Sequence, residues 1–365
     1  MQGWRGGYRI SHMRFSFRLA PRDVLTKADL STSHVTCEQG IQREKMKAAV
    51  IYQNGSPDVL KYEDVADPAC DQHGIVIRVA AISVEGGDLL QRLRGPVITS
   101  PHVIGYQAAG EIVAVGAQVT QFKCGQRVVT VNPYGSHAEL RAVPARNAWL
   151  VPEGLDIRQA AAIPVAFGTA DECLFHRGHL KAGETVLIQA GASAVGIAAI
   201  QLAKRAGATV IATASSDERL ARVAPFGLDH GINYSRENVV AAVQALTANR
   251  GVDLVVDPVG GATLQDSIRS LGYGGRLSMV GFASREPAKV DVASLLRGNR
   301  SLSGIFLAPE LGTDRVHDNI QRLIAEVSTG ALQVALDRSF PLAQCGAAHA
   351  YIESRQAVGR VLLIP

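Results

Sequence analysis

The order of hydrophobic and polar positions divides the chain into stretches with different periods. Between residues 46 and 167, short apolar runs alternate with Gly, Pro and Asp turns, which predicts a small barrel-like β domain. The predicted strands here are Ala48–Tyr52, Ile75–Ile82, Gly110–Val115 and Arg127–Val131. Between residues 169 and 282, apolar strands alternate with helices, which predicts a doubly wound parallel sheet.

The elements of the second stretch can be placed one by one. The predicted strands are Thr185–Ala190, Thr209–Ala214, Asp253–Asp257 and Arg276–Val280. The predicted helices are Val195–Ala206, Asp217–Phe226, Glu237–Ala248 and Thr263–Leu271. A final strand at Gly359–Pro365 is expected to rejoin the β domain. We therefore expect an α/β protein in which residues 46–168 and 297–365 form the β domain and residues 169–296 form the parallel-sheet domain.

Residues 1–45 show no periodic pattern, and their first acidic residue is Asp23. We expect a disordered leader that joins neither domain, with the natural start at Met46. A targeting peptide is the alternative, because organellar transit segments are also rich in Arg and poor in acids. The segment lacks an apolar stretch of about 7–15 residues, which argues against secretion.

A glycine-rich turn is the clearest functional motif of the chain. It lies between a buried strand and an Ala-rich helix, and its residues are Gly191, Ala192, Ser193, Ala194, Val195 and Gly196. Such a turn directs backbone N–H groups toward a phosphate at the positive end of the helix. In the strict G-x-G-x-x-G form a glycine would replace Ser193, whose side chain is still small enough to admit a pyrophosphate. The turn therefore predicts a dinucleotide cofactor, with a tight turn that binds no ligand as the alternative.

The end of the next strand indicates which dinucleotide. An NAD site usually has an acid here to hold the ribose hydroxyl, whereas this chain has Ser215 and Ser216 followed by Asp217 and Arg219. Two hydroxyls and a guanidinium suit a 2′-phosphate, so NADPH is favoured over NADH. Ser215 and Glu218 also fit a helix capping box, and Asp217 argues for the opposite choice because it repels a phosphate.

Charge and cysteine usage exclude several classes of function. The formal net charge of +4 arises within residues 1–45, which hold eight Lys or Arg and four Asp or Glu. The rest of the chain has no basic character, so we expect no nucleic-acid partner. No apolar stretch reaches about 18 residues, so we expect no membrane span. The five cysteines are widely spaced, which favours reduced thiols in the cytoplasm over a disulfide framework or a cysteine zinc site.

Motifs spread over residues 46–365 resemble those of one enzyme superfamily. They are Met46–Val50, Gly105–Val113, Gly125–Val128, Gly183–Ile188, Gln201–Lys204, Gly274–Leu277 and Gly359–Val361. The chain is similar to the zinc-free quinone oxidoreductases, the branch of the medium-chain dehydrogenase/reductase superfamily to which zeta-crystallin belongs. The resemblance implies a GroES-like β-barrel catalytic domain, a Rossmann cofactor domain, a quinone or α,β-unsaturated carbonyl as substrate, and a homodimer.

The resemblance also implies cofactor contacts that local patterns do not show. The family uses serines similar to those above, often with a lysine where Arg219 stands, and a tyrosine at the position of Tyr234. Around the nicotinamide it points to Thr169 and to Gly281-Phe282. Thr169 has an alternative role as the cap of a helix that starts near Ala170.

Zinc-using relatives carry Gly-His-Glu where this chain has Gly105-Tyr106-Gln107. Their first cysteine ligand, near Val84–Glu85, and their four-cysteine lobe also have no counterpart. We therefore expect no metal. Without a Lewis acid, hydride transfer favours acceptors that spread the incoming charge themselves, as quinones and enones do.

Three side chains are candidates for a catalytic role. On the loop over the nicotinamide the family usually has Asn-x-x-Asp-x-Tyr; here Asp88 matches, Glu85 replaces the Asn and Leu90 replaces the Tyr. Glu85 is suited to proton transfer, although its charge would disfavour an anionic substrate, and the two glycines after it are expected to loosen the loop or widen the pocket. Tyr106 either donates its hydroxyl into the site or packs at a strand end.

The sequence thus predicts a cytoplasmic, NADPH-dependent reductase of quinones or enones. One alternative is an enoyl-thioester or other double-bond reductase, which a long basic channel would favour. The other is a non-catalytic NADPH-binding protein, which the altered loop at residues 85–90 favours. Four histidines show no paired acid or ligand spacing and are expected to be structural or exposed: His102, His137, His176 and His179.

Overall fold

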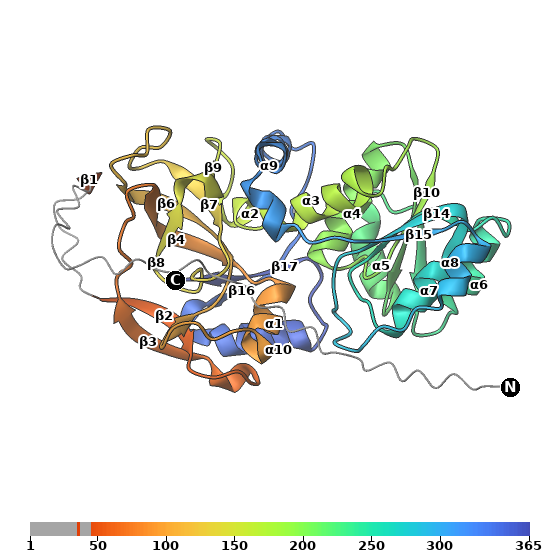
Figure 1. Ribbon diagram of the computed structural model, residues 1–365, viewed down its shortest axis with the longest axis horizontal. Coiled ribbons are helices and arrows are strands. Elements are labelled where there is room, and N and C mark those ends of the chain that lie inside the picture. Colours follow the sequence, from red (N-terminus) through yellow and green to blue (C-terminus); the bar gives the residue numbers. More distant parts are fainter. Residues whose placement is uncertain (1–34, 37–44) are drawn as a thin grey trace, which may run out of the picture. The chain divides into compact units, whose positions relative to one another are not determined.

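The computed structural model describes residues 35–36 and 45–365, and these contain the two kinds of sheet that the sequence predicts (Figure 1). The predicted leader lies outside the described residues except for Lys45 and strand β1 (Val35–Thr36). β1 pairs antiparallel with β6 (Gln107–Val115). No helix within residues 45–365 is long and apolar enough to cross a bilayer.

The β domain consists of an eight-stranded sheet and a three-stranded sheet. The larger sheet has the order β16-β17-β4-β6-β7-β9, with β8 paired to β4, and the smaller has the order β3-β2-β5. Their bounds are β2 Lys45–Ile51, β3 Lys61–Ala66, β4 Gly74–Ser83, β5 His102–Val103, β7 Arg127–Val131, β8 Leu140–Pro144, β9 Ala148–Leu150, β16 Leu336–Pro341 and β17 Arg360–Ile364. All four strands predicted before residue 132 are present.

The second domain is built on a six-stranded parallel sheet in the order β12-β11-β10-β13-β14-β15. Its strands are β10 Thr185–Ile188, β11 Thr209–Ala214, β12 His230–Asn233, β13 Val252–Asp257, β14 Leu271–Met279 and β15 Ser301–Gly304. Its helices are α4 Ala194–Arg205, α5 Asp217–Val223, α6 Val239–Leu246, α7 Ala262–Ser270 and α8 Val292–Arg297. The chain runs outward from β10 and then returns to β13 beside it, so a topological switch point lies between these two strands.

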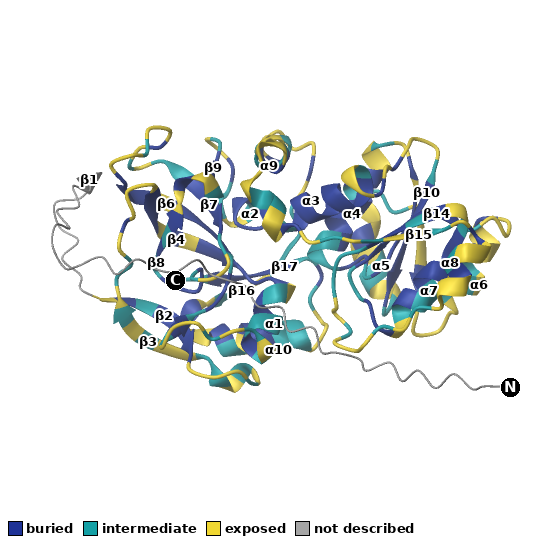
Figure 2. Ribbon diagram, in the orientation of Figure 1, coloured by how far each residue is buried: buried dark blue, intermediate teal, exposed yellow. Residues whose placement is uncertain are grey.

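Helices cover both faces of this sheet because alternate residues of its strands point to opposite sides. Val186 and Ile188 of β10 belong to the same apolar cluster as Ile197 of α4. Leu187 belongs to a separate cluster with Val243 of α6. Figure 2 shows buried residues concentrated in the strands and exposed residues on α6 and α8. The unbroken apolar run of β10 is therefore explained by burial on both faces.

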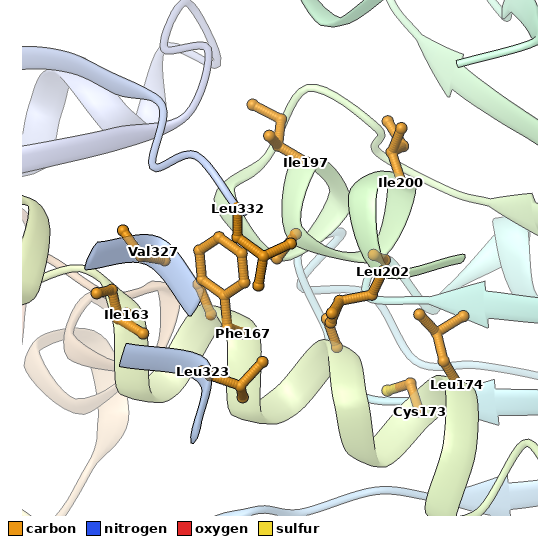
Figure 3. Packing of buried hydrophobic residues seen from close by; sticks show 14 of the residues in the cluster. Ile163, Phe167, Cys173, Leu174, Ile197, Ile200, Leu202, Leu323, Val327 and Leu332 are labelled. Atoms are coloured by element: carbon orange, nitrogen blue, oxygen red, sulfur yellow. The ribbon is translucent and has the colours of Figure 1, made fainter. Parts of the chain in front are cut away.

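Two helices lie between the domains: α3 (Ile163–Asp171), of which only a start near Ala170 was expected, and α9 (Asp314–Ser328), which was not predicted. The ring of Phe167, from α3, lies near Leu323 and Val327 of α9 (Figure 3). All three side chains belong to the apolar cluster that also contains the inner face of α4. The predicted helix start near Ala170 is wrong, because α3 begins seven residues earlier and Thr169 lies inside it.

The domain ends differ in detail from the predicted ones. β15 pairs with β14 in the parallel sheet, so that sheet extends to Gly304, beyond the boundary expected at residue 296. The final strand does rejoin the β domain, as predicted. Leu362 of β17 lies opposite Ser83 of β4 in an antiparallel pair. The parallel-sheet domain is therefore inserted between two pieces of the β domain.

A buried chain of polar groups ties helix α10 (Cys345–Glu353) to helix α1 (Gly86–Arg94). Arg92 Nη1 lies 3.3 Å from His349 Nδ1, and Nε2 of His349 lies 3.2 Å from Nε2 of His137. Because arginine can only donate, His349 accepts at Nδ1 and donates from Nε2 to His137. His137 then donates from Nδ1 to Ser136 Oγ at 3.1 Å. His137 is structural, as predicted, but its partner histidine lies 212 residues away.

The cysteines depart from the expectation of five reduced thiols. Cys70, Cys173 and Cys345 are free and buried. Cys124 is disulfide-bonded, so the expectation is wrong for this residue. Wide spacing in the sequence does not exclude a disulfide, because folding brings distant residues together.

The buried histidine pair predicts a pH-dependent stability. Burial lowers the pKa of His137 to about 3 and that of His349 well below its usual value. In the unfolded chain both rings bind a proton near pH 6.5. The contribution of this histidine pair to stability is therefore constant above that pH and falls as the pH drops toward the native values. The expected slope is about 1.4 kcal/mol per pH unit for each histidine.

Urea unfolding at pH 7.5, 6.5 and 5.5 measures this slope. His349→Asn should lower the slope by about 1.4 kcal/mol per pH unit, the contribution of one histidine, whereas the exposed His230→Asn should leave it unchanged. Equal slopes for wild type and His349→Asn would contradict the assignment.

Candidate functional site

The predicted glycine turn lies between β10 and α4, at the carboxyl edge of the parallel sheet. A Cβ on Gly191 would lie 2.7 Å from Cβ of Ala212, and one on Gly196 would lie 2.4 Å from the carbonyl oxygen of Ala190. Both glycines are therefore required for the close approach of turn, strand and helix. Ser193 caps α4, because its Oγ accepts from Gly196 N at 3.0 Å. The turn thus brings the N-terminus of α4 to the carboxyl edge of the sheet, the position at which a phosphate can accept from first-turn N–H groups.

The start of helix α5 corrects one detail of the sequence analysis. Ser216, rather than Ser215, is the N-cap, and its Oγ accepts from Arg219 N at 3.3 Å. Asp217 forms an ion pair with Arg236 at 2.7 Å. The carboxylate that was expected to repel a 2′-phosphate is therefore compensated by a neighbouring cation.

Arg219 is already bound to the backbone of the segment before β17. Its Nη1 donates to the carbonyls of Arg355 and Gln356 at 2.8 and 2.9 Å, and its Nη2 donates to that of Ala357 at 2.8 Å. Among the described residues no acceptor faces its Nε. Nε–H and the second Nη2–H form one edge of the guanidinium, the edge that binds an oxyanion with two hydrogen bonds. The sequence analysis missed this contact, because backbone carbonyls leave no sequence signal.

The nicotinamide-side candidates lie in different settings. Thr169 is buried inside α3. Gly281 follows β14 and packs on the loop after β13, since a Cβ there would lie 2.6 Å from the carbonyl oxygen of Pro258. Phe282 is half exposed beside it, and Tyr234, which follows β12, is also half exposed. Except for Thr169, these candidates follow strands of the parallel sheet at its carboxyl edge, the edge at which the glycine turn also lies.

The predicted catalytic loop is the start of helix α1. Glu85 is its N-cap residue, and the backbone N–H of Glu85 donates to Asp88 Oδ2 at 2.8 Å. Gly87 lies against Tyr106, because a Cβ on Gly87 would be 2.5 Å from the tyrosine hydroxyl. Of the two expected roles for these glycines, a looser loop or a wider pocket, Gly87 is closer to the second, since its missing Cβ makes room for the phenol. Gly86 faces open space.

Glu85 is held on several sides inside the protein. Its Oε2 forms an ion pair with Arg360 at 2.6 Å, and its Oε1 accepts from Ser83 Oγ at 2.7 Å. Gln107 Nε2 approaches the same oxygen at 3.4 Å, and Gln107 Oε1 accepts from Val165 N at 2.7 Å. Burial raises the pKa of Glu85, while the charge of Arg360 acts in the opposite direction. Glu85 is therefore a buried and ion-paired carboxylate rather than a free acid.

Tyr106 is the candidate whose hydroxyl lies against Gly87 at the start of α1. Its carbonyl accepts from Arg141 Nη2 at 2.9 Å, which fixes the backbone at the start of β6. Burial of the hydroxyl raises the pKa of Tyr106 well above its usual range, and the carboxyls of Glu85 and Asp88 add to this. Burial likewise raises the pKa of Asp88 well above its usual range. At neutral pH the phenol keeps its proton and is a hydrogen-bond donor.

One group of metal-ligating side chains occurs among the described residues. The ligand atoms of His137, Cys345 and His349 lie within 4.8 Å of one another. If a cation bound to Nε2 of His349, the ring proton would have to move to Nδ1. A proton on Nδ1 would then face the Arg92 guanidinium, which can only donate. This hydrogen-bond order suits a neutral histidine pair better than a metal centre.

A groove of about 440 Å³ lies between α6, α7 and α8 and is lined by Arg269, Arg297 and Arg300. Arg269 precedes the start of β14, and Arg300 precedes that of β15. These residues mark the amino edge of the parallel sheet, opposite the glycine turn. The groove is therefore no basic channel into the candidate active site.

Comparison with known families agrees with this architecture. Residues 71–153 match the family model described as alcohol dehydrogenase GroES-like domain. Residues 194–328 match the model described as zinc-binding dehydrogenase. These two matches correspond to the β domain and to most of the parallel-sheet domain.

Characterised relatives extend over nearly the whole chain. A 2-haloacrylate reductase of Burkholderia sp is 32% identical over 328 residues, which cover 87% of this chain and 98% of that protein. The quinone oxidoreductase of Sus scrofa is 30% identical over 330 residues, with 87% and 98% coverage. The crystal structure of Escherichia coli quinone oxidoreductase complexed with NADPH superposes with a TM-score of 0.83 at 26% identity, and covers 87% of this chain and 100% of that one.

The domain architecture, the glycine turn at the switch point and the similarity to these relatives lead to one assignment. The chain is an oxidoreductase that belongs to the zinc-free quinone oxidoreductase branch of the medium-chain dehydrogenase/reductase superfamily.

Proposed function

We propose that the chain is an NADPH-dependent reductase that reduces quinones or carbon–carbon double bonds conjugated to a carbonyl. The observation that carries this proposal is the tight turn at Gly191 and Gly196, where a Cβ would clash with Ala212 and with the carbonyl oxygen of Ala190, so that the N-terminus of α4 packs closely against the turn. It lies at the switch point, where dinucleotides bind in parallel sheets of this kind. The quinone oxidoreductase and 2-haloacrylate reductase relatives support the reaction class.

The described residues fit a phosphorylated dinucleotide. Residues 191–196 would hold the pyrophosphate, and Ser216 with the free edge of Arg219 would hold the 2′-phosphate. Asp217 is engaged by Arg236, which removes the main argument for NADH. The cofactor contacts of Thr169, Ser215, Tyr234, Gly281 and Phe282 stay predictions, as do the absence of zinc and the cytoplasmic location.

When bound, the nicotinamide supplies a hydride to the acceptor. The protein must then place the acceptor and stabilise the oxygen on which negative charge develops. Tyr106 is the group suited to that task, because its raised pKa keeps the hydroxyl protonated and its position against Gly87 fixes the ring. Glu85 and Asp88 support the pocket from behind, and Arg360 balances the charge of Glu85.

This charge balance widens the range of acceptors. Glu85 was expected to disfavour an anionic substrate, but Arg360 compensates its charge. An unsaturated carboxylate is therefore compatible with the pocket, and one relative is named a 2-haloacrylate reductase. An enoyl thioester is less well supported, because the arginine-lined groove lies at the opposite edge of the sheet.

Turnover measurements test the proposed reaction. We expect loss of NADPH absorbance with 1,4-benzoquinone, an enone or 2-chloroacrylate, and slower loss with NADH. Dialysis against EDTA should leave the rate unchanged, since the proposed stabilisation comes from side chains. No oxidation of either nucleotide with any of these acceptors would refute the proposal, and loss of activity on chelation would refute its metal-free form.

The two glycines of α1 offer a matched pair of variants for the role of Tyr106. Gly87→Ala should displace the phenol and lower kcat about tenfold or more, as expected when one oxyanion donor is lost. Gly86→Ala should keep wild-type kcat, because its Cβ would meet nothing within 4 Å. Tyr106→Phe should lower kcat to a similar extent as Gly87→Ala. Wild-type kcat in Tyr106→Phe would show that the hydroxyl takes no part.

We further propose a homodimer formed through the β15 edge of the parallel sheet. Among the described strands β15 pairs only with β14, so its other edge is open to a second copy. Exposed apolar side chains accompany this edge: Leu296 at 78%, Leu302 at 37% and Phe306 at 74%. An open strand edge with exposed apolar neighbours is typical of an interaction surface.

Light scattering of the purified protein tests the dimer. Leu302→Arg and Leu296→Asp should both yield monomers, because each places a charge on the proposed interface. Leu246→Asp, on the exposed surface of α6, should leave the molar mass unchanged. A monomeric wild-type protein, or dimers in all three variants, would contradict this interface.

A further inference from the structure

The segment Arg355–Arg360, called here the C-terminal strap, connects α10 to β17. Arg355 and Gly359 have positive φ angles of 59° and 91°. A Cβ on Gly359 would lie 2.3 Å from the carbonyl oxygen of Ala335, so both the backbone angle and the available space require glycine. The path of the strap is therefore tightly constrained by its own backbone.

The first anchor of the strap is Arg219 of α5. Its guanidinium joins three consecutive carbonyls, those of Arg355, Gln356 and Ala357. Carbonyl oxygens that converge on one point repel each other unless a cation lies between them. A planar fork with several N–H groups can bridge three such oxygens, whereas a lysine ammonium is a single point on a flexible stem.

The second anchor is the glycine turn itself. Gly359 N donates to the carbonyl of Ala192 at 2.9 Å, and Gly359 pairs with Ser193 in a parallel bridge. The strap thus lies directly beside the residues proposed to hold the pyrophosphate. A shift of the strap would change the shape of that turn.

The third anchor is Arg360, the last residue of the strap. Its Nη1 donates to Val84 O at 2.9 Å and forms the ion pair with Glu85 at 2.6 Å. Arg360 also lines a cavity of about 10 Å³ together with Phe167 of α3 and Ile197 of α4. The end of the strap therefore contacts both domains and fixes the carboxylate behind Tyr106.

We propose that Arg219 is a positioning residue that acts through the strap on the Glu85–Arg360 pair and so couples the 2′-phosphate end of the cofactor site to the reaction pocket. The cofactor part of this inference rests on the proposed function. A phosphate on the free edge of Arg219 favours the conformation in which the other edge holds the strap. Because coupling between two sites is reciprocal, phosphate binding at Arg219 and the ordered Glu85–Arg360 pair stabilise each other by the same free energy.

The matched pair Arg219→Lys and Arg205→Lys tests the coupling. Arg205 ends helix α4 and forms an ion pair with Glu326 of α9 at 2.8 Å, outside the strap. In the protein without cofactor, Arg219→Lys should speed hydrogen exchange of the Gly359 and Arg360 amides about tenfold, as loss of a charged hydrogen-bonding anchor predicts. Arg205→Lys should leave their exchange unchanged, and NADPH should slow it in the wild type more than NADH does.

Kinetics give the second readout. Arg219→Lys keeps the positive charge, so it should lower kcat about tenfold, well beyond any rise in the KM for NADPH, because the Glu85 pocket is displaced. Gly359→Ala should cause a similar loss of kcat while Arg219 is intact. Agreement between the two variants would show that the loss does not come from a folding defect in Arg219→Lys alone. Circular dichroism establishes that both variants are folded.

The possible results separate the two proposals. Unchanged strap exchange and kcat in Arg219→Lys, with only NADPH affinity lost, would overturn the coupling and leave the reductase assignment intact. A wild-type protein that reduces none of the acceptors would refute the proposed function. In that case faster strap exchange in Arg219→Lys would still support the anchoring role.

Discussion

The buried ion pair between Glu85 and Arg360 is the interaction on which the site depends. Their side chains are 3% and 7% exposed, so removing either partner would leave an uncompensated charge inside the protein, at a cost of about 3–5 kcal/mol. The pair exists only because β17 returns beside β4 after the whole parallel-sheet domain has been inserted. The return of β17 beside β4 thus joins the two pieces of the β domain and also brings Arg360 to Glu85.

Much of the fold could be predicted because its strands and helices carry their own periodic patterns. The parallel strands read as apolar runs, and their helices follow at regular spacing. The extent of helix α3 was missed because the helix is apolar on nearly every side, lying between α4 and α9, and so has no amphipathic stripe. Strand β15 was missed because its sequence, Ser301–Gly304, is short and polar, as edge strands often are.

The site was predictable only where its geometry is local. The glycine turn lies within six residues between a strand and a helix, so spacing alone indicates its structure, and the serine cap of α5 was predicted to within one residue. The contacts of Arg219 with residues 355–357 and of Glu85 with Arg360 join parts of the chain that are 136 to 138 and about 275 residues apart. No local pattern encodes such pairs. The role of Gly87 in helix α1 could not be predicted either, because it depends on contact with Tyr106, which lies directly before β6.

The charges around Tyr106 explain which acceptors this arrangement suits. Burial raises the pKa of Asp88 and favours its neutral form, Arg360 balances Glu85, and the phenol keeps its proton. The pocket therefore presents a hydrogen-bond donor with little net charge. Such a donor stabilises negative charge that is already spread over a conjugated system, but it is a weak substitute for a cation beside a localised alkoxide. Under the proposed function, the same charge balance would be compatible with both neutral quinones and unsaturated carboxylates.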